Sequence, residues 1–127
     1  MTVWIGTTLA LAIHKLQIAE HGGEDGVRDI GMLESALARA RNIAPYEPDA
    51  DVARLAAAFA VGIIKNHPFV DGNKRTGYVV METFLVLNGH QLIATEAEKY
   101  PIVIAVADGS MSEDEFGDWL RNHLAPA

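Results

Sequence analysis

The sequence predicts a single all-α domain of residues 1–127, with about six helices around a buried central helix at about 73–88. A chain of 127 residues matches one domain, because domains typically contain roughly 100–200 residues. Half of the residues are apolar, which is enough to form a core. Apolar residues recur at helical spacing in several segments, whereas 3–5 and 91–93 are candidates for short strands at most.

The first expected helix begins at Thr7 or Thr8, either of which can cap it, and ends at His21 and Gly22. Its apolar positions are Leu9, Leu11, Ile13, Leu16 and Ile18. Residues 22–31 follow with four glycines in ten positions, which predicts a loop or a tight hairpin.

The second expected helix runs from about Ile30 to Arg41, with Asp29 as its cap. Its apolar positions follow the i, i+3, i+4, i+7 pattern and are Leu33, Ala36, Leu37 and Ala40. Pro45 and Pro48 are expected to break the chain after this helix.

The third helix is expected at about Ala50 to Asn66, and Pro68 sets its end by pushing His67 out of the α region. The fourth helix, at about 73–88, is apolar on nearly all sides. Such a helix must be enclosed by others, so we expect it at the centre of the fold.

Two capping boxes predict the last two helices. The sequences Thr95-x-x-Glu98 and Ser112-x-x-Glu115 both match the capping-box pattern. Pro101 conflicts with the first of these helices, and we expect it to kink or restart that helix.

The composition excludes several classes of protein. The absence of cysteine excludes a disulfide scaffold, a thiolate nucleophile and metal sites built on sulfur. Ten basic residues against 17 acidic ones give a net charge of −7, so direct nucleic-acid binding, which needs a basic stripe, is not expected. No stretch reaches the roughly 18 apolar residues of a membrane span. The first basic residue is Lys15, unlike the positive start of a signal peptide, and we expect a cytoplasmic protein.

Residues 67–75, HPFVDGNKR, join the third helix to the fourth. Gly72 permits a positive φ, and its neighbours favour turns and caps. The next helical turn offers free N–H groups and the positive end of the helix dipole, which form an anion site. Lys74 and Arg75 would weaken a purely structural helix start, because cations there oppose the dipole. This conflict indicates a bound anion, most simply a phosphate.

Asp71 and His67 add two further chemical groups to this segment. A carboxylate beside a phosphate is placed to hold one Mg²⁺, which prefers one or two carboxylates plus phosphate oxygens. His67 is the nearby imidazole and a candidate general base. Each residue alone also has an ordinary role open to it, as a cap, a turn-former or a solvated charge. Their occurrence together within nine residues favours function, and Phe69 is expected to anchor the loop by packing.

The motif HPFVDGNKR resembles the signature loop of the Fic/Doc superfamily, and more closely that of its Doc (death-on-curing) branch. The similarity extends over nearly the whole chain, including residues 14–35 and the NGHQL sequence at 88–92. Most Fic proteins have HPFxxGNGR followed by a further arginine, whereas this chain has Lys74 and Tyr78 at the second glycine and at that arginine. Doc-like members share the lysine. For them the resemblance implies a nucleotide bound in the opposite sense, with its γ-phosphate at the target hydroxyl.

The resemblance therefore implies a protein kinase that is the toxin of a toxin–antitoxin pair. Its substrate would be ATP, its cofactor Mg²⁺, and its target a threonine of elongation factor Tu, so that translation stops. Two alternatives remain: AMP transfer to a protein hydroxyl, and a catalytically idle nucleotide-binding or regulatory module. Lys74 and Tyr78 disfavour the first, and the presence of a candidate base disfavours the second.

The roles of the family's motif residues transfer onto matching positions here. The resemblance implies that His67 takes the proton of the target hydroxyl, and that Asp71 binds Mg²⁺, assists His67 or does both. The implied nucleotide- and phosphate-binding residues are Gly72, Asn73, Lys74 and Arg75.

The glycine-rich loop matches the family's flap, which holds the target peptide beside the active site by strand-like pairing. Its candidate contacts are Gly26, Val27 and Arg28. A role for Arg28 within the loop, as a partner of Asp25 or Asp29, is equally open. No glutamate is followed by glycine or asparagine, as in the inhibitory motif of self-silencing Fic enzymes. A small antitoxin protein binding in trans is therefore expected.

Overall fold

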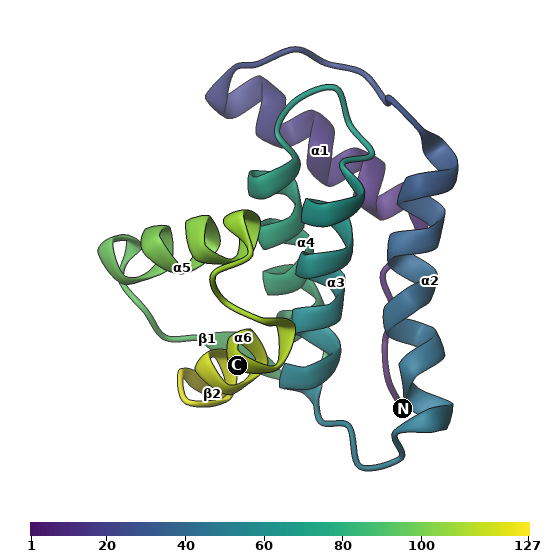
Figure 1. The fold of residues 1–127 in the computed structure, drawn as a ribbon. Helices are drawn as coiled ribbons and strands as arrows, with labels where there is room; N and C mark the ends of the chain where they lie inside the picture. Colours follow the sequence, from purple (N-terminus) through teal and green to yellow (C-terminus); the bar gives the residue numbers. More distant parts are fainter.

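The computed structural model describes all 127 residues and contains six helices and one small sheet (Figure 1). The helices are α1 (Thr7–His21), α2 (Ile30–Tyr46), α3 (Val52–Asn66), α4 (Asn73–Leu87), α5 (Glu96–Asp108) and α6 (Glu113–Arg121). The strands are β1 (His90–Leu92) and β2 (Leu124–Pro126). The predicted all-α fold class with about six helices is confirmed. None of the helices is long and apolar enough to cross a membrane.

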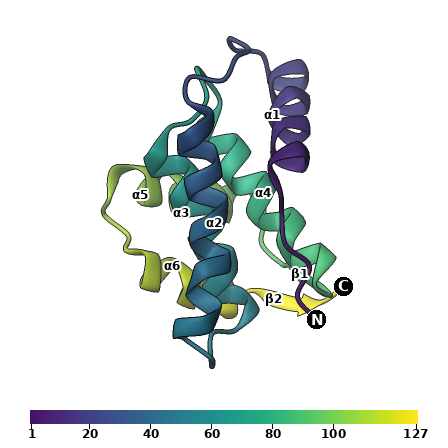
Figure 2. The same cartoon turned by 90° about the vertical axis from the view of Figure 1, so that its right-hand side faces the viewer.

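α3 and α4 lie together in the middle of the fold. α3 packs on α2, α4 and α6, and α4 packs on α1 as well. Figures 1 and 2 show α5 and α6 on the side of α3 that faces away from α2. Small side chains let the helices approach closely: a Cβ added at Gly62 would lie only 3.3 Å from the backbone of Ala36 in α2. α4 is enclosed as expected, and α3 is enclosed more fully, with ten buried residues against eight in α4.

Most of the predicted caps are present. The side chain of Asp29 accepts a hydrogen bond from the backbone of α2, and Thr95 and Ser112 both form complete capping boxes. The predicted cap of α1 is wrong, because Gly6 is the capping residue and makes no side-chain bond. Thr7 already lies inside the helix, so its hydroxyl is not at the capping position.

Two expectations about prolines are wrong. α2 continues through Pro45 to Tyr46, where a missing N–H costs little because the helix ends one residue later. α5 is continuous through Pro101 and does not restart there. Its capping box fixes the first turn, so the helix tolerates the loss of one backbone bond in the next.

The sheet differs from the two strand candidates, residues 3–5 and 91–93. β1 covers residues 90–92 and pairs antiparallel with β2, with Leu92 opposite Leu124. β2 is too short to show an alternating pattern in the sequence. Residues 3–5 form no strand, because the side chain of Asn88 pairs with the backbone of Val3 in place of a partner strand.

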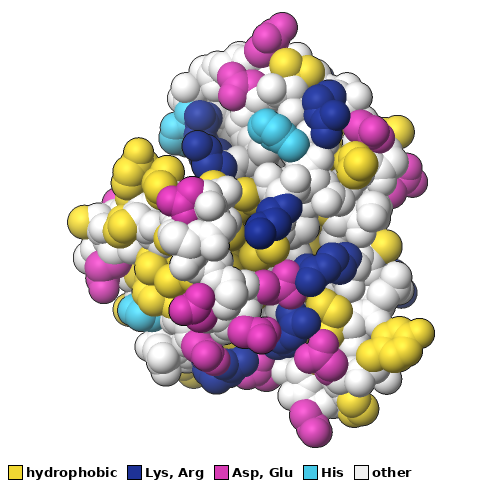
Figure 3. All heavy atoms as spheres, viewed as in Figure 1, with side chains coloured by type: hydrophobic (Ala, Val, Ile, Leu, Met, Phe, Trp, Pro, Cys, Tyr) yellow, Lys and Arg dark blue, Asp and Glu magenta, His cyan; other side chains and the backbone are white.

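Ion pairs fasten α6 to its neighbours. Glu113 of α6 contacts Arg39 of α2 and Arg54 of α3, each at 2.5 Å. Arg121 contacts Asp51, the cap of α3, at 2.6 Å. Figure 3 shows basic and acidic side chains interspersed on this face, with no continuous basic stripe.

Candidate active site

The turn between α3 and α4 carries the motif and is bracketed by two left-handed residues. His67, the C-cap of α3, has φ 53° and Gly72, the N-cap of α4, has φ 77°. A histidine in this region is strained by roughly 1–2 kcal/mol and must be held by its surroundings. Arg28 supplies that hold, because its guanidinium donates to the carbonyls of His67 at 2.7 Å and Asn66 at 3.0 Å.

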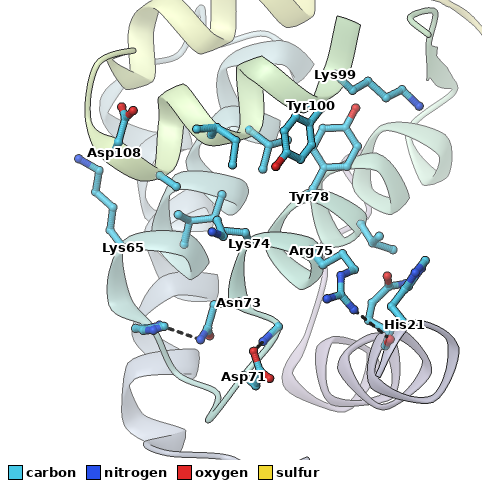
Figure 4. Close-up of a pocket in the computed structure, with 18 of the residues that line it drawn as sticks. His21, Lys65, Asp71, Asn73, Lys74, Arg75, Tyr78, Lys99, Tyr100 and Asp108 are labelled. Atoms are coloured by element: carbon cyan, nitrogen blue, oxygen red, sulfur yellow. Dashed lines mark hydrogen bonds between the residues drawn. The ribbon is translucent and has the colours of Figure 1, made fainter. Parts of the chain in front are cut away.

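Asn73 is buried beneath the turn and fixes the ring of His67. Its Oδ1 accepts from the N–H of Phe69 at 2.9 Å, and its Nδ2 donates to the Phe69 carbonyl at 2.9 Å. This pairing sets the orientation of the amide and turns the second Nδ2 proton toward Nδ1 of His67, 2.7 Å away (Figure 4). His67 Nδ1 is therefore an acceptor, and a neutral ring carries its proton on Nε2. The side chain of Asn73 positions His67 and is not free to bind an anion.

His14 of α1 contacts the same turn as a packing and hydrogen-bonding residue. It is 2% exposed and stacks on Phe69, with ring centroids 3.8 Å apart. Its Nε2 lies 2.9 Å from the carbonyl oxygen of Asp71. Phe69 is fully buried, as predicted for the anchor of the loop. The turn is thus fixed from α1 as well as from within.

Asp71 is exposed at the mouth of the turn. Its carboxylate accepts from the N–H of Glu24 at 3.2 Å and from that of Gly72 at 2.8 Å. These two bonds, with Arg75 nearby, lower the pKa of Asp71, so it is ionised at neutral pH. The Gly72 N–H, predicted to bind an anion, is instead used by Asp71.

The donor set fits Mg²⁺ held mainly by phosphate oxygens. No cluster of three or more His, Cys, Asp or Glu side chains could form a metal site by itself. Asp71 offers one ionised carboxylate whose two hydrogen bonds leave lone pairs unused. One carboxylate suffices for Mg²⁺ when phosphates supply the remaining ligands.

The first turn of α4 presents unbonded donors to a cleft of about 1400 Å³. The backbone N–H groups of Asn73, Lys74 and Arg75 make no hydrogen bond. The side chain of Lys74 is exposed, and Arg75 is half-buried, with one contact of 3.4 Å to the carbonyl of Gln17. The cleft therefore combines free amides and two cations at one helix start, which suits a polyphosphate.

The structure brings the motif residues together with side chains from α3, α4 and α5. His67, Asp71, Gly72, Asn73, Lys74 and Arg75 all line the cleft. Figure 4 shows the opposite wall, which is contributed largely by α5. The wall residues that sequence reasoning did not identify include Lys65, Glu82, Lys99 and Tyr100.

The predicted flap residues do not line the cleft but pair with the motif turn. Val27 forms an antiparallel bridge with Phe69, with backbone bonds between Val70 and Gly26 at 3.1 Å and between Arg28 and Pro68 at 2.8 Å. The N–H and C=O of Val27 make no hydrogen bond. The loop thus keeps one short strand edge open. Arg28 is used within the protein, on the end of α3, and not by Asp25 or Asp29.

Comparison with known proteins identifies similar chains. The model of the Fic/DOC family matches residues 4–85. The toxin Doc of Mycolicibacterium smegmatis (strain ATCC 700084 / mc(2)155) is 47% identical over 76 residues, which are 58% of this chain and 57% of that toxin. The match thus spans little more than half of the toxin's length. The crystal structure of the N-terminal Fic domain of a cell filamentation protein, a VirB-translocated Bep effector from Bartonella quintana, aligns with a TM-score of 0.47 and 17% identity, covering 74% of this chain and 46% of that one.

Proposed function

The chain belongs to the Fic/DOC family, and from this premise we propose that it is a toxin that transfers the γ-phosphate of ATP to a hydroxyl group of a target protein. The observation that carries the proposal is the cleft at the start of α4. There, His67, Asp71 and Lys74 line the same cleft as three unbonded backbone N–H groups.

Phosphoryl transfer suits this arrangement because it asks for positioning and charge stabilisation more than for covalent chemistry by the protein. Lys74, Arg75 and the free amides of α4 bind the phosphates. Asp71 would hold Mg²⁺, which would supply positive charge to neutralise the phosphate oxygens.

His67 receives the proton of the target hydroxyl in this proposal. Its resting hydrogen bond to Asn73 leaves the ring proton on Nε2, which is a donor. Proton acceptance at Nε2 therefore requires the ring to leave Asn73 and carry its proton on Nδ1 instead. In a largely dissociative transition state, the base has to do little to remove the proton of the target hydroxyl. The ring of His67 can therefore leave Asn73 and change its tautomer late in the reaction.

The choice of γ-phosphate over AMP rests on Lys74 and Tyr78. At these positions the general Fic pattern has a glycine, which admits phosphates close to the backbone, and an arginine, which grips them. The lysine stem fills the first space. Tyr78 is largely buried and cannot replace a guanidinium as a phosphate clamp.

The partners follow from the same proposal. The open edge of Val27 can accept one short segment of the target, which we propose to be elongation factor Tu, by strand-like pairing. The similarity to toxin Doc supports a small antitoxin that restrains this protein in trans.

The nature of the transferred group is tested with two labels. Purified protein is incubated with Mg²⁺, elongation factor Tu and either γ-³²P-ATP or α-³²P-ATP. We expect label from γ-³²P-ATP only. Lys74→Gly should lower this transfer roughly 10²–10³-fold, the usual effect of losing a preorganised charge contact to the reacting group.

His90→Ala is the matched control for a His67→Ala variant in the same assay, because His90 lies in β1 outside the cleft. The control should keep full activity, whereas His67→Ala should lose about 10²–10⁴-fold. Label from α-³²P-ATP alone would reassign the protein to AMP transfer, and label from neither nucleotide would favour the idle binding module.

A further inference from the structure

His14 is a buried histidine that the proposed reaction does not use. It lies on α1 and is 2% exposed. Its hydrogen bond joins Nε2 to the carbonyl oxygen of Asp71 at 2.9 Å, and because a carbonyl only accepts, Nε2 is the donor. Nδ1 lies 3.9 Å from the carboxylate of Asp25, which is beyond hydrogen-bond distance. The polar atoms of this ring therefore serve the Asp71 carbonyl.

Stacking alone does not explain a histidine at this position. The ring lies parallel to that of Phe69, with centroids 3.8 Å apart and an interplanar angle of 3°. A phenylalanine would make the same contact without burying ring nitrogens, whose burial is costly unless they are hydrogen-bonded. The hydrogen bond to Asp71 is what distinguishes histidine from an apolar ring here.

The carbonyl that His14 holds shares its peptide group with a second hydrogen bond of Asp71. This peptide group joins Asp71 to Gly72, and its N–H donates to Oδ1 of the Asp71 carboxylate at 2.8 Å. A peptide group is planar, so fixing its carbonyl also fixes the direction of its N–H. Oδ2 of the same carboxylate accepts from the N–H of Glu24 at 3.2 Å. The orientation of the carboxylate thus depends on the peptide plane that His14 holds.

Without His14, this peptide group is free to turn over. Gly72 has φ 77° and ψ 19°, the values of position i+2 in a type II turn. Types I and II differ mainly by a rotation of the central peptide of roughly 180°, and glycine accepts a φ of either sign. The rotation would take the Gly72 N–H away from Oδ1, so the carboxylate would lose one of its two hydrogen bonds.

We propose that His14 is a positioning residue of the site: it holds the Asp71–Gly72 peptide group, which in turn keeps the Asp71 carboxylate oriented toward Mg²⁺ on the phosphates. The purpose of this orientation, metal binding, rests on the proposed function, whereas the hydrogen bonds themselves do not. His14 does not line the cleft and acts only through Asp71.

Three variants separate the hydrogen bond from the packing. His14→Phe keeps a stacked ring and removes the donor. His14→Gln loses the stacking but places an amide N–H near the position of Nε2, so it should restore the hydrogen bond. His123→Phe is the matched control, because His123 also donates to a carbonyl, that of Trp119 at 2.7 Å, and stacks on an aromatic ring, but lies outside the cleft.

The first readout needs neither nucleotide nor metal. Hydrogen exchange of single backbone amides is followed by NMR. In His14→Phe we expect the Gly72 amide to exchange roughly tenfold faster, about the effect of one net hydrogen bond. The Phe69 amide, which donates to Asn73 at 2.9 Å, should keep its rate and so report that the turn is intact. His14→Gln and His123→Phe should leave Gly72 at the rate of the unmodified protein.

The second readout is the dependence of γ-label transfer on Mg²⁺. His14→Phe should raise the Mg²⁺ concentration for half-maximal transfer about tenfold, as expected when the hydrogen-bond partner of a metal ligand is disturbed. Most of the maximal rate should remain, because excess metal compensates for a poorly oriented carboxylate. His14→Gln should restore the original Mg²⁺ requirement. A role confined to folding would lower the maximal rate and leave this requirement unchanged.

The outcomes separate the positioning role from the reaction. An unchanged Gly72 amide in His14→Phe, or equal acceleration at Gly72 and Phe69, overturns the proposal even if γ-label transfer succeeds. Faster exchange at Gly72 with an unchanged Mg²⁺ requirement overturns the role toward the metal. Selective acceleration at Gly72 without label transfer by any variant supports the hold of His14 on Asp71 and removes the kinase proposal. If His14→Phe does not fold, the Gly72 rate of His14→Gln decides: a normal rate supports the proposal and a fast one overturns it.

Discussion

At His67, one hydrogen bond determines which ring nitrogen carries the proton. Asn73 donates to Nδ1 at 2.7 Å, and its own orientation is fixed by two bonds to Phe69. We predict that the neutral imidazole of His67 is in the Nε2–H tautomer in the free protein. Long-range ¹H–¹⁵N spectra of selectively labelled histidine distinguish the two ring nitrogens at a pH where the ring is neutral.

The spectrum of His67→Ala assigns the signal, because the resonance that disappears belongs to His67. A dominant Nδ1–H tautomer in the free protein would contradict the prediction. It would also mean that the base is ready before substrate binds and that no ring movement is needed.

The candidate site residues were predictable where they are contiguous in the sequence. Residues 67–75 contain the candidate base, the carboxylate and both cations, so covalent connection alone brings them near one helix start. Side chains from distant segments were not predictable. His14 and Tyr100 reach the site because α1 and α5 pack against α4, and neither position carries a pattern that reveals this contact.

Among the elements, the loop before α2 depends on Arg28. Its guanidinium joins that loop to the last carbonyls of α3 and holds the strained backbone of His67. We predict that Arg28→Ala lowers the free energy of unfolding by about 1 kcal/mol, a typical value for lost hydrogen bonds at a partly exposed site. Hydrogen exchange should accelerate about tenfold at the amides of Asp29 and Val70, which bond across the same junction.

Lys15→Ala is the control for this change, because the Lys15 ammonium is 77% exposed and makes one contact of 3.9 Å. Its exchange rates should match those of the unmodified protein. Unaltered rates at Asp29 and Val70 in Arg28→Ala would show that the bridge between Val27 and Phe69 holds the loop without the guanidinium.

The docking of α6 depends on Glu113, which is 15% exposed between two arginines. Burial opposes its ionisation, but hydrogen bonds from Arg39 and Arg54 outweigh burial and lower its pKa. A lowered folded-state pKa stabilises the protein above the unfolded pKa, about 4.3, and the stabilisation is lost as pH falls below it. We predict that Glu113→Gln costs about 2 kcal/mol at pH 7 and that the cost shrinks as the pH falls below about 4.

Urea unfolding at pH 7, 4 and 3 measures this cost, with Glu34→Gln as the control. Glu34 of α2 is exposed and makes no hydrogen bond or ion pair, so its substitution should be neutral. A cost for Glu113→Gln that does not depend on pH would assign the effect to packing and not to charge.

The elements were predictable wherever local chemistry decides them. The caps at Asp29, Thr95 and Ser112 depend on residues within one turn, and each is present as predicted. The prolines were misjudged because Pro45 lies one residue before the end of its helix, and because the cap at Thr95 outweighs the hydrogen bond lost at Pro101. β2 was missed because its pairing with β1 is a contact between distant segments of the chain.

At the scale of the whole molecule, a catalytic toxin should act at low abundance, since each copy modifies many target molecules. We predict that induced synthesis of this protein alone arrests bacterial growth and that His67→Ala relieves the arrest. The substitution removes the proposed base, a loss of roughly 10²–10⁴ in rate, and leaves the core intact because the His67 side chain is exposed.

Growth curves after induction, with immunoblots for equal protein levels and circular dichroism for equal helix content, measure the effect. His90→Ala should arrest growth as fully as the unmodified protein. Arrest of undiminished strength by a folded His67→Ala variant would mean that toxicity comes from binding the target rather than modifying it, and the kinase proposal would then have to be abandoned.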